Sequence, residues 1–211
     1  MDQRLSSPST ERNRAPITAV LRRILPATGT VLEIASGTGE HVAWFAAQFP
    51  DIVFQPSDPS PASRASIAAW TAGAANVRAP LALDVSVPKW ETDRGIPAPL
   101  AGILCINMVH ISPWSATLGL MRGAGRLLAG GGLLYLYGAY KRDGRHTAPS
   151  NAAFDASLRA QNSEWGVRDL EAVVAEAEAN GLALEEIVGM PANNLSVILR
   201  REPPAVTVSS A

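Results

Sequence analysis

Three acidic residues around a glycine-rich turn have the types and spacing that point most directly to chemistry. Glu33 stands near the end of the first apolar run, Asp58 ends the second, and Asp84 lies near the end of the third. Gly37 and Gly39 let the backbone bend and let a ligand approach it closely. The helix expected after this turn offers unpaired N–H groups to a carboxylate or a phosphate. The pattern therefore predicts a ligand site around the turn, filled by a dinucleotide or by a nucleoside.

Three details favour the nucleoside. The dinucleotide motif G-x-G-x-x-G needs a third glycine, and this chain has Val42 at that position. Glu33 suits a ligand that carries an ammonium or a sulfonium group, and it would repel a pyrophosphate. Asp58 can accept hydrogen bonds from ribose hydroxyls, and Asp84 can meet an adenine amino group. Each acid could also do no more than cap a helix or form a turn, so the ordered set carries the prediction.

Strand-like and helix-like patterns alternate along the chain and would position these acids. Two further strands at the end are joined by the short turn PANN and should pair antiparallel. The fold class predicted is α/β, a Rossmann-like seven-stranded sheet that is mostly parallel with an antiparallel final strand and helices on both faces. We expect a single domain over 1–201, with an N-terminal arm at 1–16 and a flexible tail at 202–211. The predicted strands are 30–35, 52–58, 77–85, 101–111, 133–140, 182–190 and 195–201, and the predicted helices are 41–49, 61–74, 112–128, 152–161 and 167–180.

Composition narrows the classes of protein. The 211 residues are 47% hydrophobic and 18% charged with a net charge of −1, which favours a globular protein and gives no electrostatic reason for nucleic acid or membrane partners. No apolar run approaches the roughly 18 residues of a membrane span, and the polar start lacks a secretory pattern. Cys105 is the single cysteine, and with three histidines it gives no metal-ligand spacing. We expect a soluble, cytoplasmic protein without a metal.

The residues E-I-A-S-G-T-G (33–39), with Asp58 and Asp84, resemble the class I S-adenosylmethionine-dependent methyltransferases. Ala35 stands where that family usually has a glycine. A closer likeness covers most of the chain, in ERNRAPI, INMVHISPW, YGAYKRDGRHTAPSNAAFD and MPANNL, and it is to a little-characterised family that includes methyltransferase-like 26. The resemblance implies S-adenosyl-L-methionine as cofactor. The cofactor-binding residues it implies are Glu33, Ala35, Ser36, Gly37, Thr38, Gly39, His41, Asp58, Asp84, Val85, Asn107 and Met108.

The same resemblance places an acceptor site after the fourth predicted strand. His110 is a candidate general base because of its ordinary pKa, although it could equally cap the next helix. Tyr140 and His146, the latter in a polar loop that could form a lid, are the other catalytic candidates, with an exposed loop histidine as the alternative for His146. The arm would fold over the site so that Arg12 grips a carboxylate. The substrate-binding candidates are Arg12, Asn13, Trp114, Tyr137 and Asn193.

The function expected is methyl transfer from S-adenosylmethionine to a small-molecule acceptor by in-line displacement. One alternative is an NAD-dependent oxidoreductase on a Rossmann sheet, which Val42 and Glu33 disfavour. The other is a non-catalytic domain that binds a nucleoside and acts through a partner protein, because a fold does not fix a function. The acceptor, the methylated atom and the oligomeric state are open from the sequence.

Overall fold

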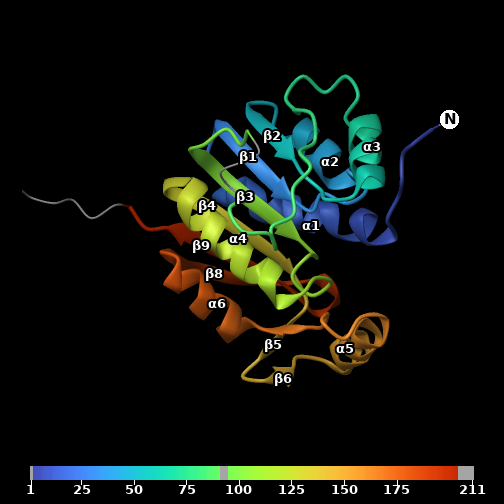
Figure 1. Cartoon of the computed structure of the whole chain (residues 1–211), viewed down its shortest axis with the longest axis vertical. Helices are drawn as coiled ribbons and strands as arrows, with labels where there is room; N and C mark the ends of the chain where they lie inside the picture. Colours follow the sequence, from blue (N-terminus) through green and yellow to red (C-terminus); the bar gives the residue numbers. More distant parts are fainter. Residues whose placement is uncertain (1, 91–94, 204–211) are drawn as a thin grey trace, which may run out of the picture.

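A six-stranded sheet with helices on both faces forms the centre of the computed structural model, which describes residues 2–90 and 95–203 (Figure 1). The strand order is β2-β1-β3-β4-β9-β8. The strands of this sheet are β1 (Gly29–Ile34), β2 (Ile52–Pro56), β3 (Leu100–Ile106), β4 (Leu128–Gly138), β8 (Leu182–Met190) and β9 (Asn194–Arg201). The helices are α1 (Pro8–Ile24), α2 (Glu40–Gln48), α3 (Pro61–Trp70), α4 (Trp114–Leu127), α5 (Pro149–Gln161) and α6 (Leu170–Ala179).

The first four strands of the main sheet run parallel, and β9 pairs antiparallel with both β4 and β8. Side chains alternate between two cores, as a sheet covered on both faces requires. Leu32 packs with α4 and α6 on one face, whereas Val31 packs with α1, α2 and α3 on the other. This is the predicted Rossmann-like α/β architecture, and its antiparallel end is confirmed.

The predicted number of seven strands is wrong, because the segment at 77–85 forms no strand. It runs beside β2 through single parallel bridges, Val77 to Phe54 and Leu81 to Ser57. Pro80 lies between the bridges and has no N–H to donate. The side-chain amide of Gln55 donates instead to the carbonyl of Ala79, 2.8 Å away. The segment therefore occupies the edge position of a seventh strand without its continuous ladder.

Most of the segment expected as an N-terminal arm is helical. Residues 8–16 form the first half of α1, and 2–7 precede it without regular secondary structure. Apolar residues at Ile17, Val20, Leu21 and Ile24 have the spacing of an amphipathic helix and are buried against the sheet. This helix was missed in the sequence, although its spacing could have revealed it. Of the predicted tail, 204–211 lies outside the described residues.

A small second sheet accompanies α5 and was not expected. It joins β5 (Tyr140–Arg142), β6 (Arg145–His146) and β7 (Arg168–Asp169) in the order β6-β5-β7. The polar loop predicted at 141–155 is therefore a hairpin followed by the start of α5. The fourth predicted strand, 101–111, also ends early, at Ile106, because Asn107 turns the chain with a φ of 61°. No helix among the described residues is long and apolar enough to cross a membrane.

Candidate active site

The strand order places a crevice at the carboxyl ends of β1 and β3. The chain passes from β1 to β2 on one side and reaches β3 on the other, so the direction of winding reverses between β1 and β3. In open α/β sheets, ligands bind at this switch point. The turn at 35–39 follows β1, and the loop at 107–113 follows β3. The predicted donor and acceptor segments therefore meet at one edge of the sheet.

The turn after β1 has the backbone conformation that the glycines suggested. Ala35, Gly37 and Gly39 have φ angles of 52°, 58° and 88°, all in the left-handed region. Gly39 also lies against α3, where an added Cβ would come within 2.6 Å of the Cα of Ile67. Ala35 takes a conformation that is strained for a residue with a side chain. The departure from the family glycine therefore changes the energy of the turn and leaves its path intact.

Asp58 is tied to this turn. It is 7% exposed, and its Oδ2 accepts a hydrogen bond from the backbone N–H of Gly37 at 3.0 Å. Its Oδ1 accepts from the N–H of Ser60 at 2.9 Å. A carboxylate has about four lone-pair positions, so both oxygens can accept further hydrogen bonds from a ligand.

Glu33 is a buried carboxylate without a full set of partners. Glu33 is 2% exposed, and its Oε2 has no hydrogen-bond partner among the described residues. Burial raises the pKa of Glu33 to about 7, against a smaller opposing effect of Ser36. A buried polar atom without a partner is destabilising. A cationic ligand group would relieve this cost, so the residues present fit a nucleoside that carries an ammonium and a sulfonium.

The remaining predicted cofactor residues fall into three groups. Asp84 is exposed and accepts hydrogen bonds from the N–H and hydroxyl of Ser86, which is a local turn. Val85 and Met108 are buried in the core beneath α4. The others support the turn: Ser36 N–H donates to Ser57 O, Thr38 Oγ1 donates to Glu40 Oε2, and His41 Nε2 lies 2.8 Å from Asn13 Oδ1.

The residues before α1 also brace the turn. The N–H of Ser7 donates to Glu40 Oε2 at 2.6 Å, and the N–H of Leu5 donates to the hydroxyl of Ser66. That hydroxyl in turn donates to the carbonyl of Thr38 at 2.6 Å. Two segments far apart in the sequence thus hold the start of α2 in place.

A cavity of about 570 Å³ opens beside Asn107. This volume is in the range of small-molecule sites. Its walls come from α1, the loop after β3, the end of β4, α5 and the connection η1 (Pro191–Asn193) between β8 and β9. The lining residues are Ser9, Arg12, Asn13, Asn107, His110, Ile111, Tyr137, Ala139, Ser150, Asn151, Phe154, Pro191, Ala192, Asn193 and Asn194.

His110 lies in the wall of this cavity. It is 4% exposed, and its ring meets Phe154 edge-on with 5.2 Å between the ring centroids. Gly138 leaves room for it, since a Cβ there would come within 3.0 Å of the His110 ring. Burial, and then the charge of Arg168, lowers the pKa of His110 to about 4. The imidazole is therefore neutral at physiological pH but a weaker base than an ordinary histidine, so the ordinary pKa on which its prediction as a general base rested is wrong.

Four of the five predicted substrate residues line the cavity. Tyr137 faces it from the end of β4, and burial raises the pKa of its hydroxyl against the opposing effects of Asn13, Asn194 and Arg12. Arg12 and Asn13 lie in the first turns of α1, not in an arm. The carbonyl of Asn193 accepts from the side-chain amide of Asn151 at 3.0 Å. Trp114 is the exception, since it packs at the start of α4 beneath the guanidinium of Arg168.

Two of the three predicted catalytic residues lie elsewhere. Tyr140 is 1% exposed within the core, and its hydroxyl has no hydrogen-bond partner among the described residues. His146, in β6, lies 3.4 Å from Asp155 Oδ2. Lys141 and Arg159 also pair with Asp155, which accepts a hydrogen bond from Val167 N–H as well, so this group holds α5 to the small sheet. His110 alone of the three lines the cavity.

Several cavity residues were missed in the sequence. Phe154, Asn151 and Asn194 come from α5 and from the start of β9. Nothing in their spacing relates them to Asn107 or His110, because only the folding of α5 over the end of the sheet brings them together.

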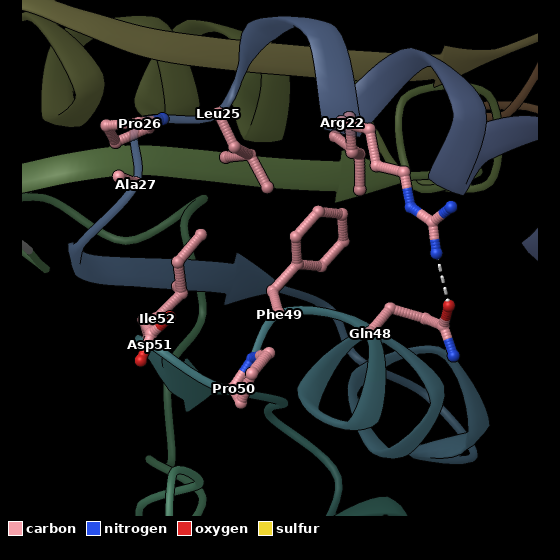
Figure 2. Close-up of a pocket in the computed structure, with 10 residues that line it drawn as sticks. Arg22, Leu25, Pro26, Ala27, Gln48, Phe49, Pro50, Asp51 and Ile52 are labelled. Carbon is pink, nitrogen blue, oxygen red and sulfur yellow. Dashed lines mark hydrogen bonds between the residues drawn. The ribbon is translucent and has the colours of Figure 1, made fainter.

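A second hollow of about 300 Å³ lies at the opposite, amino end of β1 and β2. It is bounded by the last turns of α1 and α2 and by the chain at 25–27 and 49–52 (Figure 2). Figure 2 shows Arg22 reaching across it to the side chain of Gln48, with a hydrogen bond of 2.6 Å. None of the predicted site residues lines this hollow.

Comparison with solved structures shows a methyltransferase fold. An O-methyltransferase family protein from Burkholderia thailandensis matches 92% of this chain with a TM-score of 0.77 at 16% identity. The mitomycin 7-O-methyltransferase MmcR matches 92% with 0.75 at 16%, and CalO1, a methyltransferase in calicheamicin biosynthesis solved in an SAH-bound form, matches 92% with 0.68 at 18%. The alignments cover 58%, 54% and 55% of those three chains, so this chain spans a little over half their length.

The fold is therefore that of Rossmann-like methyltransferases. The resemblance to the methyltransferase-like 26 family stays a prediction, because the family model that matches carries another description. That model covers residues 4–201, nearly the whole chain. The chain belongs to the family described as "Protein of unknown function (DUF938)".

Proposed function

We propose that the protein transfers a methyl group from S-adenosylmethionine to a small-molecule acceptor. One observation carries the proposal: a buried carboxylate with an unpartnered oxygen, Glu33, lies next to a left-handed turn at the switch point of a methyltransferase fold. The nearby 570 Å³ cavity gives an acceptor a place on the other side of Asn107. SAM dependence and the O-methyltransferase activity of the structural neighbours support this reading.

Glu33, the turn at 35–39 and Asp58 would hold the cofactor. When bound, it supplies a methyl group on a cationic sulfur, ready for in-line displacement. Asp58 would accept hydrogen bonds from the ribose, because its two oxygens retain free lone pairs. Glu33 would balance the positive charge of the ligand in a site that excludes water.

The chain's own residues would then align the acceptor and take its proton. Positioning can supply most of the acceleration of such a transfer. Asn107, at the end of β3, lies between the turn and the cavity and would orient the acceptor atom through its side-chain amide. The neutral His110 would accept a hydrogen bond from the acceptor hydroxyl and take its proton as the new bond to the methyl group makes that proton acidic, because its lowered pKa makes it too weak a base to remove the proton beforehand.

Calorimetry with S-adenosylhomocysteine tests the proposal directly. We expect binding to the wild-type protein and a loss of about one to two orders of magnitude in Asp58→Ala, if two hydrogen bonds of roughly 1–1.5 kcal/mol each are lost. Asp51→Ala is the matched control, because it removes the same charge from the exposed amino end of β2. The proposal fails if millimolar ligand gives no heat, or if Asp51→Ala weakens binding as much as Asp58→Ala. Incubation with methyl-labelled donor and a metabolite library then tests transfer itself.

A further inference from the structure

The cavity beside Asn107 has an uneven charge that bears on which acceptor it can take. Arg12 is the one cationic side chain among its lining residues, and no aspartate or glutamate lines it. His110 adds no charge at neutral pH because its pKa is about 4. A protonated amine would find no counter-charge here and would be repelled by Arg12. The electrostatics therefore favour a neutral or anionic acceptor.

Arg12 differs from the other arginines of α1. Arg14 lies over the ring of Trp44 at 4.4 Å, Arg22 donates to Gln48, and Arg23 pairs with Glu186 at 3.0 Å. Within the described part of the chain, Arg12 has no ion pair and no hydrogen bond through its side chain. It is held on a regular helix at the rim of the cavity, so its guanidinium is available for a bidentate contact with a carboxylate.

Part of the cavity lining is apolar. Phe154 and Ile111 are 39% and 43% exposed, which is unusual for large hydrophobic side chains. Both line the cavity, together with Ala139 and Pro191. Phe154 also meets the ring of His110, so an apolar body resting on Phe154 would bring its reactive atom near the imidazole.

The part of the lining that comes from α5 and from the β8–β9 connection is fixed by its own hydrogen bonds. Asn151 Nδ2 donates to the carbonyl of Asn193, and Asn193 Nδ2 donates to Ser150 Oγ at 3.2 Å. Ala192 and Asn193 both have left-handed φ angles, of 58° and 57°. Strain of this kind persists only where the surroundings hold it, and it is common at ligand sites. The wall of α5 that carries Phe154 is therefore held to the β8–β9 connection by the fold.

We propose that the cavity binds a small organic acid with a flat apolar body, whose carboxylate pairs with Arg12 and whose body rests on Phe154. The atom to be methylated lies at the inner end, between Asn107 and His110. This inference rests on the proposed methyl transfer for the role of the site, but the charge preference is a separate claim about binding.

A matched series of probes tests the charge preference. 4-Hydroxyphenylacetate is anionic, 4-hydroxyphenylacetamide is its neutral analogue, and tyramine is a cation of similar size. We expect calorimetry on the full chain, saturated with S-adenosylhomocysteine, to give about ten- to a hundredfold tighter binding of the acid than of the amide, and the weakest binding for tyramine. A parallel series built on 6-hydroxy-2-naphthoate extends the test to a two-ring body.

Variants of α1 assign the preference to Arg12. We expect Arg12→Ala to reduce the affinity for the acids to that for the amides, while amide binding is unchanged. Arg22→Ala removes the same charge from the same helix and should leave all affinities as they are, because Arg22 faces the other hollow. Arg12 is exposed, so its replacement should leave the thermal midpoint unchanged, and this is checked by melting each variant.

The outcomes separate this inference from the proposed function. Equal affinities for acid and amide, a preference for tyramine, or no acid binding that depends on Arg12 would overturn the inference even if S-adenosylhomocysteine binds. Failure of S-adenosylhomocysteine to bind, with an Arg12-dependent preference for acids retained in its absence, would support the inference and overturn the methyltransferase proposal.

Discussion

The two hollows of this protein lie at opposite ends of the same sheet and share α1, yet they differ in almost every physical respect. At the amino end, Arg22 is hydrogen-bonded to Gln48, and Asp51 supplies an opposite charge to the lining. At the carboxyl end, Arg12 is unpaired within the described chain, and no acid balances it. Helix α1 thus contributes an arginine with a hydrogen-bond partner, Arg22, to the amino-end hollow. It contributes Arg12, whose side chain has no such partner in the described chain, to the carboxyl-end cavity.

Backbone strain also differs between the residues around the two hollows. Non-glycine residues with left-handed φ angles occur at the carboxyl end at Ala35, Asn107, Ala192 and Asn193, and none of the residues that line the amino-end hollow has one. Buried groups with shifted pKa values, Glu33 and His110, also lie at the carboxyl end. Unrelieved strain and unpaired polar groups are destabilising, and they persist where a ligand uses them. The comparison therefore supports the proposal that a ligand binds at the carboxyl end.

The largest expected effect on stability comes from a glycine of the turn at the carboxyl end, Gly39, compared with Gly73 as a control. Gly39 and Gly73 have similar φ angles, of 88° and 84°, but an added Cβ meets the backbone of Ile67 at 2.6 Å in the first case and nothing within 4 Å in the second. We expect Gly39→Ala to lower the free energy of unfolding by about 3 kcal/mol, from strain and overpacking together. Gly73→Ala, with strain alone, should lower it by about 1 kcal/mol. Urea denaturation measures both, and equal losses would mean that the turn does not pack tightly against α3.

The next test is the pH dependence that Glu33 confers on cofactor binding. Because the pKa of Glu33 is about 7 and a cation needs the ionised form, affinity for S-adenosylhomocysteine, which carries an ammonium, should rise about tenfold from pH 6 to pH 8. Glu33→Gln should bind weakly at both pH values without this rise. A wild-type affinity that is flat over this range would remove Glu33 from the cofactor site.

The same carboxyl group has an opposite effect on stability. Its folded pKa is raised from 4.5 to about 7, so the unfolded chain releases this proton first as the pH rises. The stability associated with the protonated form is present below about pH 4.5 and is lost as the pH rises to about 7, a change on the order of 3 kcal/mol. At pH 8, Glu33→Gln should therefore melt at a higher temperature than the wild type while binding ligand less well.

The smallest expected effect concerns Ala35. Since this residue has a φ of 52°, Ala35→Gly should raise the free energy of unfolding by up to about 1 kcal/mol. The same change at Ala68, which is exposed within α3, should lower it by about 1 kcal/mol. Opposite signs for one substitution would localise the strain to the turn, whereas a loss at both positions would show that Ala35 is relaxed.

The turn and the two acids at the switch point could be placed together from the sequence because these residues are close in sequence or end consecutive strands. Glu33, Gly37 and Gly39 belong to one strand–turn–helix unit, and the position of Asp58 after β2 follows from the fold class. The absence of the seventh strand could not be predicted in this way. The segment 77–85 is apolar enough to pair, but Pro80 interrupts it and only single bridges form. A local sequence pattern is enough to predict the positions of residues that belong to one strand–turn–helix unit.

The acceptor end could not be predicted in the same way. Only the family likeness predicts Arg12 at the site, and the sequence pattern does not reveal that α1 carries it. Tyr140 and His146 were chosen from a strand end and a polar loop, but the hairpin formed by β5 and β6 turns them away, one into the core and the other to Asp155. Phe154 and Asn193 reach the cavity only through tertiary packing, which no spacing in the sequence encodes.

The residues proposed to bind the nucleoside and many of those that line the cavity lie in different parts of the chain. This separation bears on how related proteins could differ. The residues proposed to hold the nucleoside lie within 33–58, whereas part of the cavity wall comes from α5 and the β8–β9 connection, more than ninety positions later by the numbering. Asn107 borders both, and Asn13 links the cavity to His41 behind the turn. Substitutions in those two later segments would change which acceptor is bound and leave the proposed nucleoside site unchanged. Members of the family would then share a methyl donor and differ in their acceptors.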